Sequence, residues 1–123
     1  HLFTLVKNLA NNLPNLRFFD AVAWDKSFDF FSRAKILVNT SEAEGFPNTF
    51  LQAGVMKTPV LSFKVNPNNY LKTYNCGLIG SDLNLILKSP VKLKIMGQNH
   101  YDYVKKHHSL KNLEIFKQTL YKL

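Results

Sequence analysis

The sequence is poor in cysteine and in acidic residues, and it contains no long hydrophobic run. Cys76 is the single cysteine, so the chain forms no internal disulfide, and no Cys/His spacing typical of a metal site surrounds it. We expect Cys76 to be an ordinary buried or half-buried thiol in a protein of the reducing cytoplasm. No apolar stretch approaches the roughly 18 residues that a membrane-spanning helix needs. Residues 1–3 do not resemble a signal peptide.

The chain has 123 residues, a length that suits one domain, 1–123, built around one core. Its composition, 46% hydrophobic and 20% charged, is that of an ordinary globular protein. The sequence does not begin with methionine, and we therefore expect it to be a segment of a longer reading frame.

The net charge is +8, and most of the excess positive charge lies in the second half of the chain. Residues 61–123 contain ten lysines and three acidic residues, whereas residues 1–60 contain six basic and five acidic residues. Three explanations fit this surplus: a solvated lysine-rich surface, attraction to an anionic membrane surface, or a nucleic-acid partner. Nucleic acid is the least favoured, because the surplus is lysine rather than arginine and no recognised nucleic-acid motif is present.

Apolar residues at helical spacing predict several helices. Residues 2–13 form an amphipathic pattern that Pro14 ends, and Asp25 or Ser27 can cap a second helix. Pro47 suits the first turn of a third helix. Further helices are predicted at residues 83–87 with Ser81 or Asp82 as cap, at residues 90–104, and at residues 110–120.

Short apolar segments between these helices predict strands at residues 16–19, 36–38 and 58–63, and a strand or turn at residues 77–80. The continuous run Ile36-Leu37-Val38 is typical of a strand buried on both faces. Strands that alternate with helices predict an α/β fold, a Rossmann-like three-layer α/β/α arrangement around a parallel sheet. Ligands bind beyond the carboxyl ends of such strands, which points to the loops after Val38 and Phe63.

The loop after Val38 contains the residues with the clearest chemical meaning. It opens a helix, and the free N–H groups of a first helical turn can hold phosphate with the help of the helix dipole. Gly45 allows a sharp turn and a close approach of a ligand to the backbone. Glu44 is placed to contact hydroxyl groups, and Gln52 on the second helical turn either meets a ribose or faces solvent. Together these groups predict a pocket for a phosphate flanked by sugar hydroxyls.

These residues resemble the retaining GT-B glycosyltransferases of the group 1 (family 4) type, which have two Rossmann domains and use nucleotide sugars. The signature of that family is two glutamates separated by seven residues, within Ser…Glu-Gly-Phe…Glu-Ala…Gly-x-Pro-Val. This chain reads Ser41, then Glu44-Gly45-Phe46-Pro47-Asn48-Thr49-Phe50-Leu51-Gln52-Ala53, then Thr58-Pro59-Val60. Residues 13–18 and 34–38 resemble two strands of the family, and residues 96–109 resemble its C-terminal helices.

The resemblance implies a role for each matching position. Glu44 takes the place of the first glutamate, the catalytic position that contacts the transferred sugar. Gln52 replaces the second glutamate, which binds the ribose hydroxyls; because glutamine has no charge and one acceptor oxygen, we expect weaker donor binding or an altered nucleotide preference. No metal and no cofactor beyond the donor substrate is required. The turn that holds the sugar and the diphosphate is formed by Gly45, Phe46, Pro47, Asn48 and Thr49.

The resemblance also implies that the chain is the C-terminal, donor-binding half of such an enzyme, truncated at its front. We expect the full-length hexosyltransferase to act on a sugar or lipid-linked acceptor in the cytoplasm or at the inner face of the membrane. The acceptor would bind through an N-terminal domain that these residues lack, so the fragment alone is expected to be inactive. The alternatives are a degenerate, non-catalytic Rossmann-like binding module and a basic nucleic-acid-binding protein.

Three histidines, His100, His107 and His108, fall near a lysine-rich helix end. A favourable interaction of their positive charge with the helix C-terminus is expected in preference to metal binding.

Overall fold

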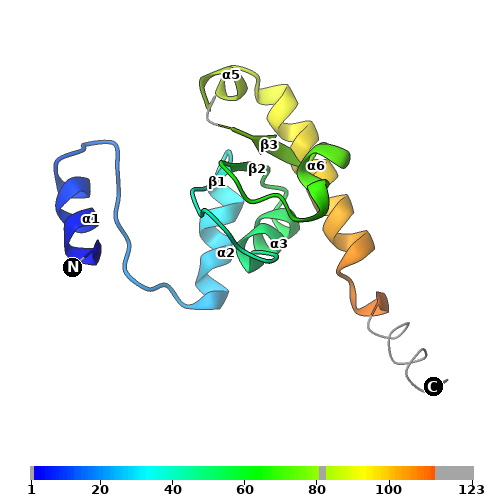
Figure 1. Cartoon of the computed structure of the whole chain (residues 1–123), viewed down its shortest axis with the longest axis horizontal. Helices are drawn as coiled ribbons and strands as arrows, with labels where there is room; N and C mark the ends of the chain where they lie inside the picture. The colour runs from blue at the N-terminus through cyan, green and yellow to red at the C-terminus, as the bar shows by residue number, and fades with distance from the viewer. Residues whose placement is uncertain (1, 81–82, 113–123) are drawn as a thin grey trace.

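A three-stranded parallel sheet forms the centre of the fold (Figure 1). The structure is a computed structural model and describes residues 2–80 and 83–112. The strands are β1 (Leu37–Asn39), β2 (Val60–Ser62) and β3 (Gly77–Ile79), in the spatial order β1-β2-β3. Asn39 pairs with Ser62, and Ser62 pairs with Ile79, so the three carboxyl ends are aligned. The strands predicted near residues 36–38, 58–63 and 77–80 are confirmed.

Helices precede, connect and follow these strands. They are α1 (Leu2–Asn11), α2 (Trp24–Arg33), α3 (Asn48–Val55), the 3-10 helix η1 (Pro67–Asn69), α4 (Tyr70–Thr73), α5 (Leu83–Leu87) and α6 (Pro90–His107). The long helix predicted after Pro90 is confirmed as α6. Ser81 and Asp82, named as caps of α5, lie outside the described residues, as does most of the helix predicted at residues 110–120.

Apolar side chains cover both faces of the sheet, as a Rossmann-like three-layer arrangement requires. On one face, Leu37 and Val60 pack with Phe50 of α3 and with Tyr70 and Leu71 of α4. On the other face, the cluster consists of Ile36, Leu78, Leu83 of α5 and Leu93 and Met96 of α6. Successive strand residues point to opposite faces, which is why Ile36 and Leu37 join different clusters. The predicted α/β/α fold class is confirmed.

The prediction of a strand at residues 16–19 is wrong. This segment runs as an extended connection between α1 and α2, and Figure 1 shows α1 apart from the sheet. Phe18 meets the ring of Phe3 edge-on at 5.2 Å, and Phe19 meets Phe30 at 4.8 Å. A parallel strand needs a hydrogen-bonding neighbour, and no segment within the described residues pairs with this one. Apolar character alone therefore did not make it a strand.

The start of α2 also differs from the prediction. The residue before its first turn is Ala23, which makes no side-chain capping hydrogen bond, and the helix begins at Trp24. Asp25 lies within the first turn, where its negative charge faces the positive end of the helix dipole. Ser27 donates a hydrogen bond from Oγ to the Trp24 carbonyl oxygen at 2.6 Å. Neither Asp25 nor Ser27 is the cap.

Two glycines allow α6 to pack closely against the rest of the domain. A Cβ at Gly54 of α3 would lie 2.5 Å from Val104 Cγ2 of α6. A Cβ at Gly97 of α6 would collide with the carbonyl oxygen of Lys57, just before β2. Because both positions lack a side chain, α6 begins over one face of the sheet and ends against α3 on the other.

His100 is not at a charged helix end, and that expectation is wrong. Its side chain is fully buried in the middle of α6. The ring Nδ1 lies 2.8 Å from the Thr58 carbonyl oxygen, and Nε2 lies 3.3 Å from the Tyr70 hydroxyl. Since a carbonyl can only accept, Nδ1 carries the hydrogen and Nε2 accepts from Tyr70. Burial lowers the pKa of His100, which keeps the imidazole neutral, while the bond to Thr58 acts in the opposite direction.

Cys76 is completely buried, as expected, and burial raises the pKa of its thiol to about 12. The thiol is therefore protonated and unreactive at neutral pH. Within the described ranges, no helix is both long and apolar enough to cross a bilayer.

Candidate functional site

The carboxyl ends of β1 and β2 bring together the residues that the sequence analysis singled out and one that it did not. Asn39 ends β1 and stands beside Ser62, the last residue of β2. The Phe63 amide donates to the Asn39 carbonyl oxygen at 3.0 Å, which fixes this edge of the sheet. The loop of residues 40–47 begins here and leads into α3. This is the edge at which open parallel sheets bind ligands.

Asn39 connects the sheet to this loop through both ends of its side-chain amide. Its Nδ2 donates to Glu44 Oε1 at 3.2 Å, and its Oδ1 accepts from the Ser41 amide at 3.1 Å. Ser62 Oγ donates to the same Oδ1 at 3.4 Å. Asn39 was not among the predicted site residues. The available signal was a polar side chain that directly ends a buried apolar strand.

The two carboxylates of the loop have different partners. Glu42 forms an ion pair with Lys64, which follows β2 on the neighbouring loop. Both side chains of that pair are exposed, so it adds little to stability. Glu44 is also exposed and, within the described part of the chain, makes no ion pair. Its carboxylate is oriented by Asn39 and stays open to a ligand, which fits a role in contacting hydroxyl groups.

The N-terminus of α3 lies directly after this loop. Pro47 occupies the capping position and forms no side-chain capping hydrogen bond. Pro47 was predicted in the first helical turn and lies one residue before it. Asn48 and Thr49 are exposed, and the first N–H groups of a helix have no partner within the helix. The helix dipole favours negative charge at this end, so these amides can bind an anion.

Gly45 and Phe46 complete the turn in front of α3. Gly45 does not have a positive φ, so the chain does not need glycine there for its conformation, contrary to the expectation of a glycine-dependent sharp turn. A Cβ at Gly45 would meet nothing within 4 Å, which leaves open space in front of the backbone. Phe46 is half-buried and stacks on Tyr70, with ring centroids 5.2 Å apart.

A family model described as glycosyl transferases group 1 matches residues 4–84, which is more than half of the chain and includes both strands and the loop of this site. The chain belongs to the glycosyl transferases group 1 family. No curated protein and no solved structure matches it.

In this glycosyltransferase chain, Gln52 lies on α3, one turn beyond the helix N-terminus. Its side chain is buried, and its Nε2 donates to Ser27 Oγ of α2 at 3.2 Å. The alternative in which Gln52 simply faces solvent is therefore wrong. A contact of Gln52 with a ribose stays a prediction.

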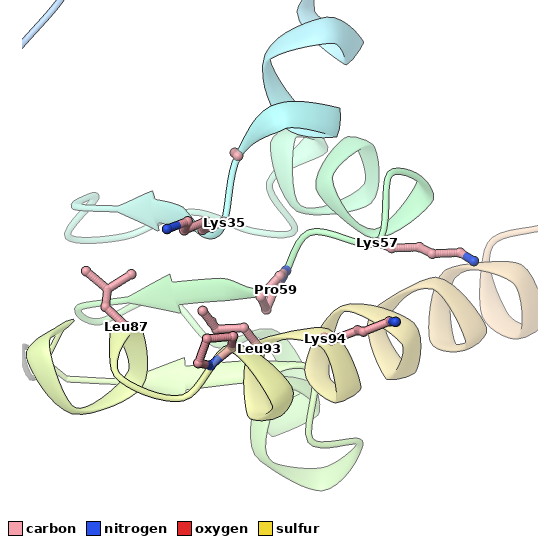
Figure 2. A pocket seen from close by; sticks show the side chains of 8 residues that line it. Lys35, Lys57, Pro59, Leu87, Leu93 and Lys94 are labelled. Atoms are coloured by element: carbon pink, nitrogen blue, oxygen red, sulfur yellow. The ribbon is translucent and has the colours of Figure 1, made fainter.

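A cavity of about 270 Å³ lies at the opposite, amino-terminal end of the strands (Figure 2). Pro59, directly before β2, and the side chains of Leu87 and Leu93 give it an apolar lining. Figure 2 shows the Lys57 and Lys94 side chains extending in one direction and Lys35 in the other. Because the three ammonium groups do not converge, the cavity is not built to clamp a single phosphate. The motif residues and this cavity therefore form separate regions.

Proposed function

We propose that this chain binds the nucleoside-diphosphate sugar of a retaining glycosyltransferase at the carboxyl edge of β1 and β2. The observation that carries the proposal is the placement of Glu44, held by Asn39 at 3.2 Å, directly before the uncapped N-terminus of α3. In a member of a glycosyltransferase family, that pairing offers a carboxylate for sugar hydroxyls and free amides for a diphosphate.

Each part of the donor has a candidate partner. Glu44 accepts hydrogen bonds from the transferred hexose. The turn of Gly45, Phe46 and Pro47 approaches the sugar and the diphosphate, and the amides of Asn48 and Thr49 bind the diphosphate. Gln52 offers its amide oxygen to the ribose from the second turn of α3, while its Nε2 donates to Ser27.

Charge builds up on the diphosphate as the bond to the sugar breaks. Helix-terminal amides aimed at that group stabilise the transition state more than the ground state, which lowers the barrier. The proposal assigns this role to the amides of α3 and to basic side chains, not to a metal ion. No described side chain at this edge suits the role of a general base better than another.

The acceptor in the proposed reaction is a hydroxyl of a glycan or of a lipid-linked sugar, bound by another part of the full-length enzyme. A non-catalytic binding module is the second candidate, and one observation favours it. Gln52 replaces an acidic residue of the signature, and its Nε2 is engaged by Ser27 inside the domain. A module of this kind would bind the nucleotide without transferring the sugar, so a product assay on the full-length protein separates the two candidates.

An anionic membrane is a further proposed partner, and the junction of α5 and α6 is the surface that fits it. Exposed apolar side chains lie here among lysines, and residues 83–95 contain no acidic residue; we call this surface the α5–α6 patch. It consists of Leu87, Val91, Ile95, Lys57, Lys88, Lys92 and Lys94. Val91 is 71% exposed and Ile95 51% exposed. Apolar groups that insert at the headgroup level, flanked by lysines that reach the phosphates, are typical of membrane-surface helices.

Cosedimentation with vesicles tests this docking. Binding to phosphatidylglycerol vesicles but not to phosphatidylcholine vesicles is expected, and substitution of Lys92 and Lys94 by glutamine should weaken it about fivefold per lysine. Lys72→Gln, on α4, is the matched control and should have no effect. Equal loss with Lys72→Gln, or tighter binding to duplex DNA than to vesicles, would exclude the patch as a membrane surface.

Ligand-observed NMR tests the donor site. Uridine, guanosine and adenosine diphosphates and their hexose derivatives are titrated into the protein at low salt. If the sugar nucleotide of one base binds more tightly than the sugar nucleotides of the other two bases, the proposal is supported and the base is identified. If none binds either to this chain or to the full-length protein, the donor-site proposal is wrong.

A further inference from the structure

The loop that precedes α3 is held in place by side chains rather than by its own backbone. Residues 40–46 form no backbone–backbone hydrogen bond with any described residue; the first such bond after the loop is the one from the Phe50 amide of α3 to the Pro47 carbonyl oxygen. At the strand end of the loop, Asn39 binds Ser41 and Glu44. At the helix end, the half-buried ring of Phe46 packs on the core cluster that contains Tyr70, and the next residue, Pro47, is buried. The contacts of Phe46 therefore help to set where the diphosphate-binding turn lies.

Phe46 is the first member of a stack of three aromatic rings. Its ring lies 5.2 Å from that of Tyr70 in α4, with an angle of 27° between the planes. Tyr70 in turn stacks on Tyr103 of α6 at 4.5 Å and 24°. His108, at the end of α6, also meets Phe46 at 5.0 Å. The C-terminal end of α6 thus reaches the turn in front of α3.

The middle ring of this stack is fixed by hydrogen bonds. Tyr70 is 1% exposed, and its hydroxyl donates to His100 Nε2 at 3.3 Å. His100 donates through Nδ1 to the Thr58 carbonyl oxygen, between α3 and β2. Because packing and a hydrogen bond already fix the Tyr70 ring, little further conformational entropy is lost when Phe46 stacks on it. Tyr103 is only half-buried and stacks on Tyr70.

We infer that Tyr70 and Tyr103 are positioning residues for donor binding, because they hold Phe46 and with it the diphosphate-binding turn. The inference rests on the proposed function of that turn. It gives the C-terminal end of α6 a role in the site, through the contacts of Tyr103 with Tyr70 and of His108 with Phe46. Neither tyrosine touches the donor; each acts through Phe46.

Ordinary packing would also explain three stacked rings. The test therefore compares a substitution that destabilises the stack with one that destabilises the core on the other face of the sheet. Tyr103→Leu removes the outer ring, and Tyr103→Phe keeps the ring without its hydroxyl. Met96→Ala is the matched control, because Met96 is 1% exposed and packs on the opposite face of the sheet, away from Phe46. All three variants are made in the 123-residue chain, and their melting temperatures are recorded beside their affinity for the nucleoside diphosphate that binds best.

The expected result is that Tyr103→Leu weakens diphosphate binding about two- to tenfold, the range of one aromatic pair. Tyr103→Phe, which keeps the ring, should bind the diphosphate with the affinity of the parent. Met96→Ala should leave it unchanged while lowering the melting temperature at least as much. The inference is overturned if Tyr103→Leu binds as the parent does, or if Met96→Ala weakens binding to the same degree.

Amide hydrogen exchange without ligand separates this inference from the proposed function. Tyr103→Leu should speed the exchange of the amides of residues 42–46 relative to Met96→Ala. If the parent binds no nucleotide but this difference is observed, the donor proposal fails and the positioning contact stands. If the exchange rates of the loop are the same in both variants, the positioning role is refuted even where the nucleotide binds.

Discussion

The side-chain amide of Asn39 donates a hydrogen bond to the carboxylate of Glu44 over 3.2 Å. The loop between them forms no backbone–backbone hydrogen bond with any described residue. Asn39 ends a strand whose position the sheet fixes, so the bond transfers that rigidity to an exposed acid. An exposed glutamate would otherwise sample several rotamers. The fold therefore pre-orients the one loop carboxylate that Lys64 does not neutralise.

Replacement of Asn39 by alanine should reduce binding of the sugar but not of the diphosphate. The loss of one hydrogen bond to a charged group predicts about a tenfold smaller gain in affinity when the sugar is added to the nucleotide. Calorimetric titration with a nucleoside diphosphate and with its hexose derivative measures that gain. Ser62→Ala is the control, because it removes one of the two hydrogen bonds to Asn39 Oδ1 and leaves the bond from Nδ2 to Glu44. An unchanged gain in Asn39→Ala would show that Glu44 does not need this bond.

Gln52→Glu should change stability and affinity in opposite directions. A carboxylate at this buried position loses the hydrogen bond that Nε2 donates to Ser27, so the free energy of unfolding should fall by about 1–2 kcal/mol at neutral pH. A charged acceptor facing ribose hydroxyls should instead strengthen nucleotide binding about threefold to tenfold. Urea unfolding and titration of the same samples measure both quantities.

Ser27→Ala provides the control for Gln52→Glu, because it removes the same hydrogen bond without adding charge. Its stability should fall and its nucleotide affinity should stay at the parent value. If Gln52→Glu binds nucleotide no better than Ser27→Ala, Gln52 does not face the ribose.

Much of the sheet, and the placement of the candidate site residues beside it, could be predicted from the sequence, because local patterns determine them. The apolar run Ile36-Leu37-Val38 and the segment that Pro59 begins both predict strands, and the two strands are neighbours in the sheet. The predicted burial of residues 36–38 on both faces is wrong, because β1 is an edge strand in which Val38 is 41% exposed. Glu44 and the start of α3 lie together because the loop between them is only a few residues long. The long helix α6 follows from Pro90 at its first position.

The contacts between distant segments could not be predicted in this way. Residues 16–19 have the composition of a strand, but strand formation depends on a neighbour that no local pattern specifies. His100 lies in a lysine-rich helix, and only the fold shows that it faces Thr58, 42 positions earlier. The stack of Phe46 on Tyr70 likewise joins two segments whose spacing has no helical or strand period.

The buried His100 predicts a loss of stability at acidic pH. Its pKa is lowered in the folded protein, so below the ordinary imidazole value of about 6.5 the unfolded chain binds a proton that the folded one resists. The free energy of unfolding is therefore unaffected by His100 above that pH and falls as the pH decreases, by at most about 1.4 kcal/mol per pH unit. Urea unfolding over this range measures the slope.

Two substitutions identify which group causes this slope. His100→Gln should remove most of the pH dependence. His108, whose pKa is also lowered by partial burial and then by the charge of His107, should contribute little because its side chain is exposed. A slope that persists in His100→Gln and vanishes in His108→Gln would contradict this assignment.

Alanine at two glycines should separate binding from folding. Gly45→Ala adds a Cβ into open space at a backbone conformation that alanine can adopt, so the melting temperature should hardly change while donor binding weakens. Gly97→Ala drives a Cβ into the Lys57 carbonyl oxygen and should cost at least about 3 kcal/mol of stability. Thermal unfolding and titration distinguish the two. Unchanged donor affinity in Gly45→Ala would show that the ligand does not approach this backbone.

The measurement that tests the donor-site proposal most directly compares two neighbouring carboxylates, Glu44 and Glu42. For the parent, Glu44→Ala and Glu42→Ala, the affinity of the best nucleoside diphosphate is measured with and without its hexose. The account predicts that Glu44→Ala loses the gain from the hexose and keeps the affinity for the diphosphate, whereas Glu42→Ala, which breaks only the exposed ion pair with Lys64, keeps both. If the two variants behave alike, or if the hexose adds nothing in the parent, the assignment of the sugar site to Glu44 is wrong.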